Sequence, residues 1–149
     1  MSTAVFPGSF DPVTTGHVDL IRRASRMFDR LVVGVLVNSA KQPLFSKEER
    51  VAMLREITAD QDNIEVSSFE GLLVDFVKEQ HADAIVRGLR TPGDFEYELP
   101  LAQANHKLSV QADTIFLASA PEYSYISSSA VRELLRYQAD ISGYVPETV

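Results

Sequence analysis

A turn-rich segment near the N-terminus carries the residues with the clearest chemical potential. It runs from Pro7 to His17, follows a short apolar run and precedes a segment with helical periodicity. This order predicts a strand, a tight turn and then a helix. Backbone N–H groups in such a turn, and at a helix N-terminus, attract anions. Because His17 falls in the first helical turn, its ring can reach the same anion, which is typical of a nucleotide-phosphate site.

The end of this segment, Thr14-Thr15-Gly16-His17, differs from the two common phosphate loops. The chain contains neither a Gly-x-Gly-x-x-Gly sequence nor a Gly-x-x-x-x-Gly-Lys sequence followed by Ser or Thr. Thr-x-Gly-His instead resembles the signature of the nucleotidyltransferase superfamily. The alternative is an ordinary helix N-terminus whose histidine is a capping or surface residue.

A second candidate segment, Arg87-Gly88-Leu89-Arg90, is followed by Asp94-Phe95-Glu96-Tyr97-Glu98. Guanidinium groups suit phosphate oxygens better than a lysine does, because they form two parallel bonds. Gly88 would let the backbone approach a ligand, and Glu98 can either orient an arginine or bind a ribose hydroxyl. The alternative is a strand end with two surface arginines.

A third candidate segment runs from Tyr123 to Arg132 and contains Ser127, Ser128 and Ser129. Serines at the start of a helix supply hydroxyl and N–H donors to an anion, and the tyrosines can lie beside a base. Serine is also a preferred N-cap residue, so an ordinary helix cap explains the same pattern.

Apolar runs alternate with helix-periodic segments along the chain. The predicted strands are Thr3–Phe6, Leu31–Val37, Ile64–Ser67, Ala84–Arg87 and Thr114–Leu117. The predicted helices are Gly16–Phe28, Lys47–Ile57, Leu72–Gln80, Asp94–Leu108 and Ser128–Gln138. This alternation predicts an α/β fold with one Rossmann-like, doubly wound, five-stranded parallel sheet and helices on both faces. We expect residues 1–149 to form a single domain.

The candidate segments all follow predicted strands, as do Lys41 after the second strand and Leu72–Leu73 after the third. Ligands of open α/β sheets bind outside the carboxyl ends of the strands. Five loops are therefore expected to converge on one site. Lys41, Arg87 and Arg90 would give this site a local positive charge that attracts phosphate groups.

Composition narrows the function classes. The chain has 149 residues, no cysteine and a net charge of −7. Disulfides and thiolate chemistry are excluded, and a reducing cytoplasm is the expected compartment. The acidic balance argues against nucleic-acid binding. No apolar run approaches the ~18 residues of a membrane span, and no export leader is recognised.

Together, the three segments resemble the phosphopantetheine adenylyltransferase family. Pro7–His17 meets its Pro-Gly-(Ser/Thr)-Phe-Asp-Pro-x-Thr-x-Gly-His pattern, and Arg87–Glu98 meets its Arg-Gly-Leu-Arg…Asp-Phe-Glu-Tyr-Glu pattern. Ile126–Arg132 meets Ile-Ser-Ser-Ser-x-x-(Arg/Lys), and Lys41 precedes a Pro-Leu-Phe sequence by one residue. The resemblance covers nearly the whole chain in order and spacing.

The resemblance implies adenylyl transfer from ATP to 4′-phosphopantetheine, which yields dephospho-coenzyme A and pyrophosphate. It also implies a homohexamer and Mg²⁺ carried mainly by the ATP phosphates, with no metal-binding residue in the protein. The implied catalytic residues are His17, Lys41 and Arg90. The implied acceptor-binding residues are Ser9, Lys41, Leu73, Arg87 and Asn105. The implied ATP-binding residues are Ser9, Phe10, His17, Gly88, Leu89, Arg90, Glu98, Tyr123, Ser124, Tyr125, Ile126, Ser127, Ser128 and Ser129.

Such chemistry fits the residues available. A phosphate monoester has a second pKa of about 6, so it is already a dianionic nucleophile near neutral pH. Direct in-line attack needs positioning and charge stabilisation, without a covalent intermediate. Two alternatives remain: a related nucleotidyltransferase that acts on nicotinamide mononucleotide or uses CTP, and a non-catalytic nucleotide-binding module.

Other residues receive structural interpretations. We expect His81 and His106 to be surface or capping histidines. Asp11 is expected to cap the turn before Pro12. Leu20, Met27 and Phe28 fit a core-facing helical stripe.

Overall fold

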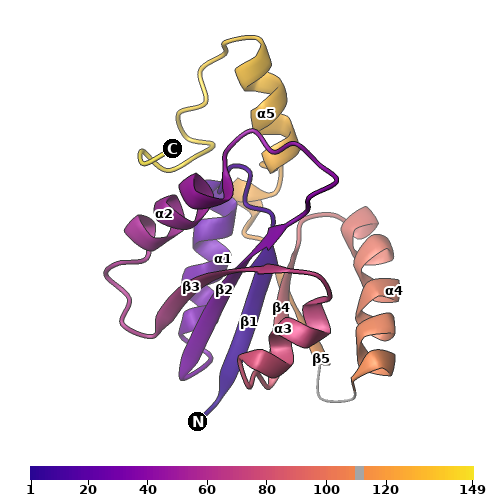
Figure 1. Cartoon of the computed structure of the whole chain (residues 1–149). Helices are drawn as coiled ribbons and strands as arrows, with labels where there is room; N and C mark the ends of the chain where they lie inside the picture. The colour runs from indigo at the N-terminus through magenta and orange to yellow at the C-terminus, as the bar shows by residue number, and fades with distance from the viewer. Residues whose placement is uncertain (110–112) are drawn as a thin grey trace.

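The computed structural model describes residues 1–109 and 113–149, and its centre is a five-stranded parallel sheet (Figure 1). The strands are β1 Thr3–Gly8, β2 Arg30–Val37, β3 Ile64–Glu70, β4 Ala84–Leu89 and β5 Asp113–Ala118. Their order is β3-β2-β1-β4-β5, and every neighbouring pair is parallel. The order reverses between β1 and β4, which makes their carboxyl ends the expected ligand site.

Helices cover both faces of this sheet. They are α1 Thr15–Ser25, α2 Lys47–Ile57, α3 Leu73–Glu79 and α4 Pro92–Leu108, whereas α5 Ser128–Arg136 lies beyond the carboxyl ends of the strands (Figure 1). Phe6 and Val33 belong to the core that α1 and α2 cover, whereas Val5 and Ile85 pack with α3 on the other face. Strands buried on both faces explain the continuous apolar runs in the sequence. The predicted doubly wound α/β class is confirmed.

Several predicted element boundaries differ near the site, including those of β1 and α1, and β4 continues through Gly88 to Leu89. β1 continues through Pro7 and Gly8, which pair with β2, so the turn begins only at Ser9. α1 ends at Ser25, and Met27 lies beyond it with 55% of its surface exposed. The prediction of Met27 as a core residue was therefore wrong, because the chain leaves the helical stripe to enter β2. Leu20 is buried and Phe28 packs against the core, as predicted.

Side-chain caps begin the helices that surround the site. Thr14 caps α1, Thr91 caps α4 and Ser127 caps α5, each by accepting a backbone N–H from the third residue after it. The predicted Ser46–Glu49 capping box of α2 is present, with both bonds at 3.1 Å. These caps satisfy backbone donors that a helix start leaves unpaired. Within the described ranges, no helix is both long and apolar enough to cross a membrane.

Candidate active site

A cavity of about 250 Å³ opens at the carboxyl ends of β1 and β4. The loop after β1, the N-terminal part of α1, the end of β4, helix α4 and the start of α5 all contribute to its wall. Ten of the residues predicted for the site line it. They are Ser9, Phe10, His17, Arg87, Gly88, Arg90, Glu98, Ile126, Ser127 and Ser128. Three segments that are distant in the sequence therefore meet at the predicted edge of the sheet.

Other predicted residues do not line this cavity. They are Lys41, Leu73, Leu89, Asn105, Tyr123, Ser124, Tyr125 and Ser129. Lys41 lies on an exposed loop after β2, Leu73 begins α3 and Asn105 is near the end of α4. Tyr125 is exposed and meets the ring of Tyr144 edge-on, with 5.8 Å between centroids. The ligand contacts of all these residues stay predictions.

The ring of His17 is part of the capping box that begins α1. The backbone N–H of Thr14 donates to His17 Nδ1 at 3.0 Å, while His17 N–H donates to Thr14 Oγ1 at 3.2 Å. The ring also meets Phe10 edge-on at 5.0 Å. Because Nδ1 accepts a hydrogen bond, the neutral ring carries its proton on Nε2 and can donate from there.

The environment of His17 favours that neutral form. The pKa of the His17 imidazole is lowered to about 4, first by burial of the ring and in addition by the positive charges of Arg87 and Arg90. A ring with this pKa is uncharged near neutral pH. It is therefore suited to donate one hydrogen bond to a phosphate rather than to supply a positive charge.

Arg87 forms a two-bond ion pair with Glu98. Its Nε and Nη2 donate to the Glu98 carboxylate at 3.0 and 2.6 Å, and Nη1 donates to the Pro7 carbonyl at 2.9 Å. Three of the five donors of a guanidinium are used, so the others can still reach an anion. Of the two functions considered for Glu98, orientation of an arginine is the one visible in this geometry.

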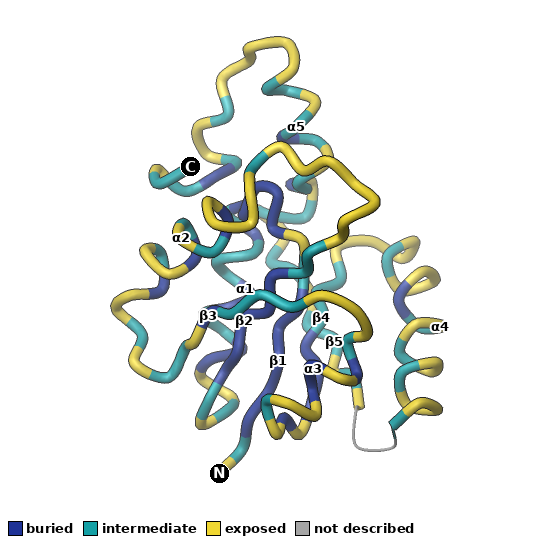
Figure 2. The backbone as a smooth tube through the Cα atoms, viewed as in Figure 1, coloured by how far each residue is buried: buried dark blue, intermediate teal, exposed yellow. Residues whose placement is uncertain are grey.

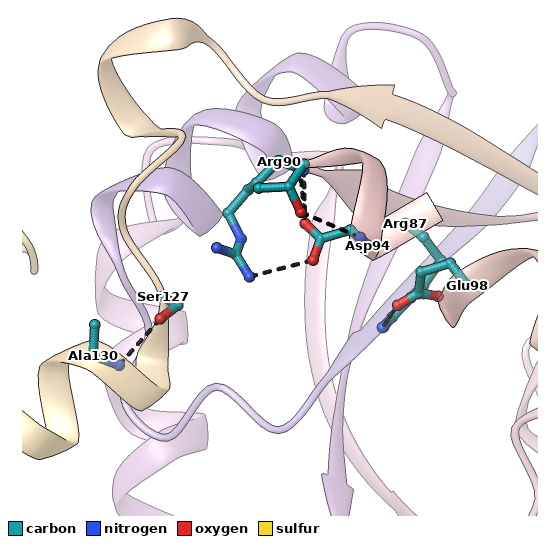
Figure 3. Close-up of polar contacts among 7 residues, drawn as sticks. Arg87, Arg90, Asp94, Glu98, Ser127 and Ala130 are labelled. Carbon is teal, nitrogen blue, oxygen red and sulfur yellow. Dashed lines mark hydrogen bonds and ion pairs between the residues drawn. The ribbon is translucent and has the colours of Figure 1, made fainter. Parts of the chain in front are cut away.

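Arg90 is held beside the start of α4 by Asp94. One Asp94 carboxylate oxygen accepts the backbone N–H of Arg90 at 2.8 Å, and the other lies 3.6 Å from Arg90 Nη2. In the view of Figure 3, this pair lies between the Ser127 cap of α5 and the Arg87–Glu98 pair. The sequence interpretation did not include Asp94 in the site. Its spacing of four residues from Arg90 is the signal that would have suggested the contact.

The space beside the Cα atom of Gly88 is filled by a neighbouring side chain. A Cβ atom at this position would lie 2.4 Å from Leu20 Cδ1 on α1. The glycine therefore lets β4 approach α1 closely beneath the cavity. The predicted contact of the Gly88 backbone with ATP stays a prediction.

Two buried charged residues tie the loop after β1 to its neighbours. Asp11 was predicted to cap its own turn, but this was wrong, because its carboxylate accepts the backbone N–H groups of Leu44 and Phe45 at 2.8 Å each. Arg50 donates to the carbonyl oxygen of Ser9 at 2.9 Å. These partners lie more than thirty residues apart in the chain, so no local pattern indicates them.

The acidic groups of the cavity are already engaged by arginines. Asp94 pairs with Arg90 and Glu98 with Arg87. In residues 1–109 and 113–149, no cluster of three or more His, Asp or Glu side chains is arranged to hold a metal ion. His81 is exposed, and His106 pairs with Asp113 at 3.0 Å; neither lines the cavity.

Known proteins match this chain along most or all of its length. The profile of the cytidylyltransferase-like family matches residues 5–134. A phosphopantetheine adenylyltransferase from Lachnoclostridium phytofermentans is 52% identical over the whole chain, which spans 91% of that protein. The chain belongs to the phosphopantetheine adenylyltransferase family. Proteins of the same name from Caldanaerobacter subterraneus and Clostridium novyi are 50% and 48% identical, again over the whole chain and over 93% and 92% of their own lengths.

The family membership confirms the predicted enzyme class, a nucleotidyltransferase. A solved lipopolysaccharide core biosynthesis protein from Thermoplasma volcanium shares the fold, with a TM-score of 0.60. The match covers 80% of this chain and 98% of that chain at 23% identity, so it supports the architecture alone.

Proposed function

We propose that this enzyme transfers the adenylyl group of ATP to 4′-phosphopantetheine, forming dephospho-coenzyme A and pyrophosphate in the penultimate step of coenzyme A synthesis. The observation that carries the proposal is similarity to phosphopantetheine adenylyltransferases along the whole chain. The site supports it, because His17, Arg87 and Arg90 surround one cavity at the switch point of the sheet. Two cationic side chains and a neutral donor suit a reaction between two polyanions.

In the proposed mechanism the acceptor phosphate is its own nucleophile. It attacks the α-phosphorus of ATP in line and displaces pyrophosphate, with no covalent intermediate on the protein. His17 Nε2–H donates to an α-phosphate oxygen, where negative charge grows during the attack. Arg90 and Lys41 supply the positive charge that the neutral imidazole does not.

The two substrates divide the site between them. ATP is proposed to contact the turn at Ser9 and Phe10, the end of β4 with Arg90, Glu98, and the segment 123–129. The acceptor is proposed to contact Ser9, Lys41, Leu73, Arg87 and Asn105. Since Lys41 lies on an exposed loop outside the cavity, binding requires that loop to approach the acceptor phosphate.

We propose that magnesium is held at this site through the substrate. Asp94 and Glu98 are held by arginines, so the ion would be bound by ATP phosphate oxygens and water. When bound, it would neutralise charge on the leaving pyrophosphate. The residues of this chain orient the nucleotide around it through Ser9, Ser127 and Ser128.

A homohexamer remains a proposal, and the surface of α4 supports assembly of some kind. Phe95, Tyr97, Leu101 and Leu108 of this helix are exposed, and so is Ile115 on the edge strand β5. Tyr97, Leu101 and Leu108 are spaced by four and seven residues, so they lie on one face of α4, and an exposed apolar face of this sort marks a contact site. Sedimentation velocity should give the mass of six 16.5 kDa chains, and Leu101→Glu should shift it downward. The cytoplasmic location and the lack of nucleic-acid binding also stay predictions.

Pyrophosphate release tests the proposed reaction. We expect release from ATP with phosphopantetheine, and none with nicotinamide mononucleotide, with CTP in place of ATP, or without an acceptor. Release with nicotinamide mononucleotide or CTP would favour the related nucleotidyltransferases. No release with any acceptor, despite ATP binding, would favour a non-catalytic module. His17→Ala, purified in parallel, controls for contaminating activity.

A further inference from the structure

The loop that carries Lys41 is tied to the loop after β1 at both of its ends. It joins β2 to α2, and residues 38–44 are exposed (Figure 2). Before the loop, Arg50 Nη1 donates to the carbonyls of both Leu36, at 3.2 Å, and Ser9, at 2.9 Å. After it, the Asp11 carboxylate accepts the N–H groups of Leu44 and Phe45. The segment Ser9–Pro12 is thus joined to each side of the Lys41 loop.

Both connecting side chains are buried. Arg50 is 4% exposed and Asp11 is 6% exposed. Burying a charge is unfavourable unless hydrogen bonds replace its hydration. Backbone carbonyls surround the Arg50 guanidinium, including that of Ser46 at 3.3 Å, and backbone N–H groups face the Asp11 carboxylate. Each side chain therefore favours one defined arrangement of the backbone around it.

The segment to which the loop is joined is itself held from α5. Arg132 Nη1 donates to the Asp11 carbonyl at 2.7 Å, and Ser128 Oγ donates to the Pro12 carbonyl at 2.7 Å. Between its two attachments the Lys41 loop forms a local turn, in which Lys41 N–H donates to the Asn38 carbonyl at 3.1 Å. The turn is a small unit whose ends are placed relative to Ser9–Pro12.

We propose that Asp11 and Arg50 are positioning residues for capture of the acceptor phosphate. They place both ends of the Lys41 loop against the segment that faces the phosphates, so that Lys41 reaches an anion bound there. Neither side chain lines the cavity, so both act through the loop rather than on a substrate. This inference rests on the proposed function and on the predicted role of Lys41 in it.

Asp11→Asn tests one attachment with little change in size. An amide can accept only one of the two N–H groups, and its own NH₂ then faces the other. Loss of such a charged bond should raise the KM for phosphopantetheine by ~10-fold and the KM for ATP by less than ~2-fold. Arg50→Lys, which weakens the other attachment, should also raise the KM for phosphopantetheine more than the KM for ATP. This variant replaces Asp11→Asn as the test if Asp11→Asn does not fold.

A double-mutant comparison separates positioning from general stability. In the Lys41→Ala background, Asp11→Asn should raise the KM for phosphopantetheine by less than ~2-fold over Lys41→Ala alone. The lysine side chain that Asp11 positions is already absent there. Trypsin should cleave after Lys41 faster in Asp11→Asn than in the parent enzyme. The matched control is Asp83→Asn, whose carboxylate accepts the Thr3 N–H at 2.8 Å outside the cavity and should change neither readout.

Several results would overturn the inference. An equal rise in both KM values, or an undiminished effect in the Lys41→Ala background, would show a general structural role. An unchanged acceptor KM in both Asp11→Asn and Arg50→Lys would also reject it, even if Lys41→Ala weakens acceptor binding. Failure of the proposed function is recognised separately, since the parent enzyme would then release no pyrophosphate with phosphopantetheine.

Discussion

The backbone N–H of Thr14 donates to Nδ1 of His17, 3.0 Å away, and so determines which ring nitrogen carries the proton. The same threonine accepts the N–H of His17 through its hydroxyl. The capping box of α1 thus also orients the imidazole. Its free nitrogen, Nε2, is left as a donor toward the cavity that the ring lines.

His17→Ala should lower kcat by ~10²–10³-fold, as expected for loss of one donor to a charged transition state. The KM for ATP should change far less, because the bond to the α-phosphate strengthens mainly as charge develops. Steady-state kinetics of the folded variant checks this. His81→Ala, on an exposed histidine outside the cavity, is the control and should behave like the parent enzyme. A variant that kept near-normal kcat would exclude the role.

The pH dependence of activity should follow the substrate and not the histidine. With the pKa of His17 lowered to about 4, the ring stays neutral across the working range. The acid limb of kcat/KM for phosphopantetheine should then lie at about 6, the second ionisation of its phosphate. The limb should persist in His17→Gln, and rates should not fall just above neutrality. A limb that vanished in the variant would show that the imidazole sets it.

Stability should also change with pH through His17. The folded-state pKa of about 4 lies below the unfolded value of 6.5, so the unfolded chain takes up a proton first on acidification. The stabilisation that the neutral His17 ring gives to the folded state is fully present above pH 6.5 and is lost as the pH falls toward 4. Urea unfolding at several pH values should show this loss, and His17→Gln should reduce its slope. An unchanged slope in the variant would contradict the shifted pKa.

Arg87→Lys should weaken phosphopantetheine binding by ~10-fold, because a point charge cannot replace the two-bond contact of a guanidinium. Glu98 would lose part of its pairing, so the melting temperature should fall as well. Arg90→Lys should instead weaken mainly the binding of ATP. Calorimetric titration of each ligand into each variant tests whether Arg87 serves phosphopantetheine and Arg90 serves ATP. Equal losses of both ligands in both variants would reject it.

Gly88→Ala should destabilise the fold by about 1–3 kcal/mol, since its Cβ would meet Leu20 and overpack the wall beneath the cavity. Leu20→Val in the same chain should recover part of the loss by making room. Gly93→Ala is the matched control, because its Cβ would meet only Thr91 Oγ1 at 3.7 Å. Urea denaturation compares the three variants. Equal stability of the two alanine variants would show that Leu20 yields without strain.

Much of the architecture could be predicted from the sequence alone. The bounds of α2 match because its signals are local: a Ser46–Glu49 capping box and a helical repeat. The five strands were recognisable as apolar runs, and the topology rules for parallel sheets then place Ser9, His17, Arg87 and Arg90 at one edge. The helix length after His17 was overestimated, because Met27 continues the repeat although the chain has already turned.

The partners of the charged residues were decided only by the tertiary structure. Asp11 meets Leu44 and Phe45, and Arg50 meets Ser9, because the loops after β1 and β2 converge at the sheet edge. Gly88 faces Leu20 for the same reason, since β4 and α1 pack together there. Periodicity and capping reflect backbone bonds and burial within one segment. The choice of partner depends on which distant segments meet, and that is a property of the packed chain.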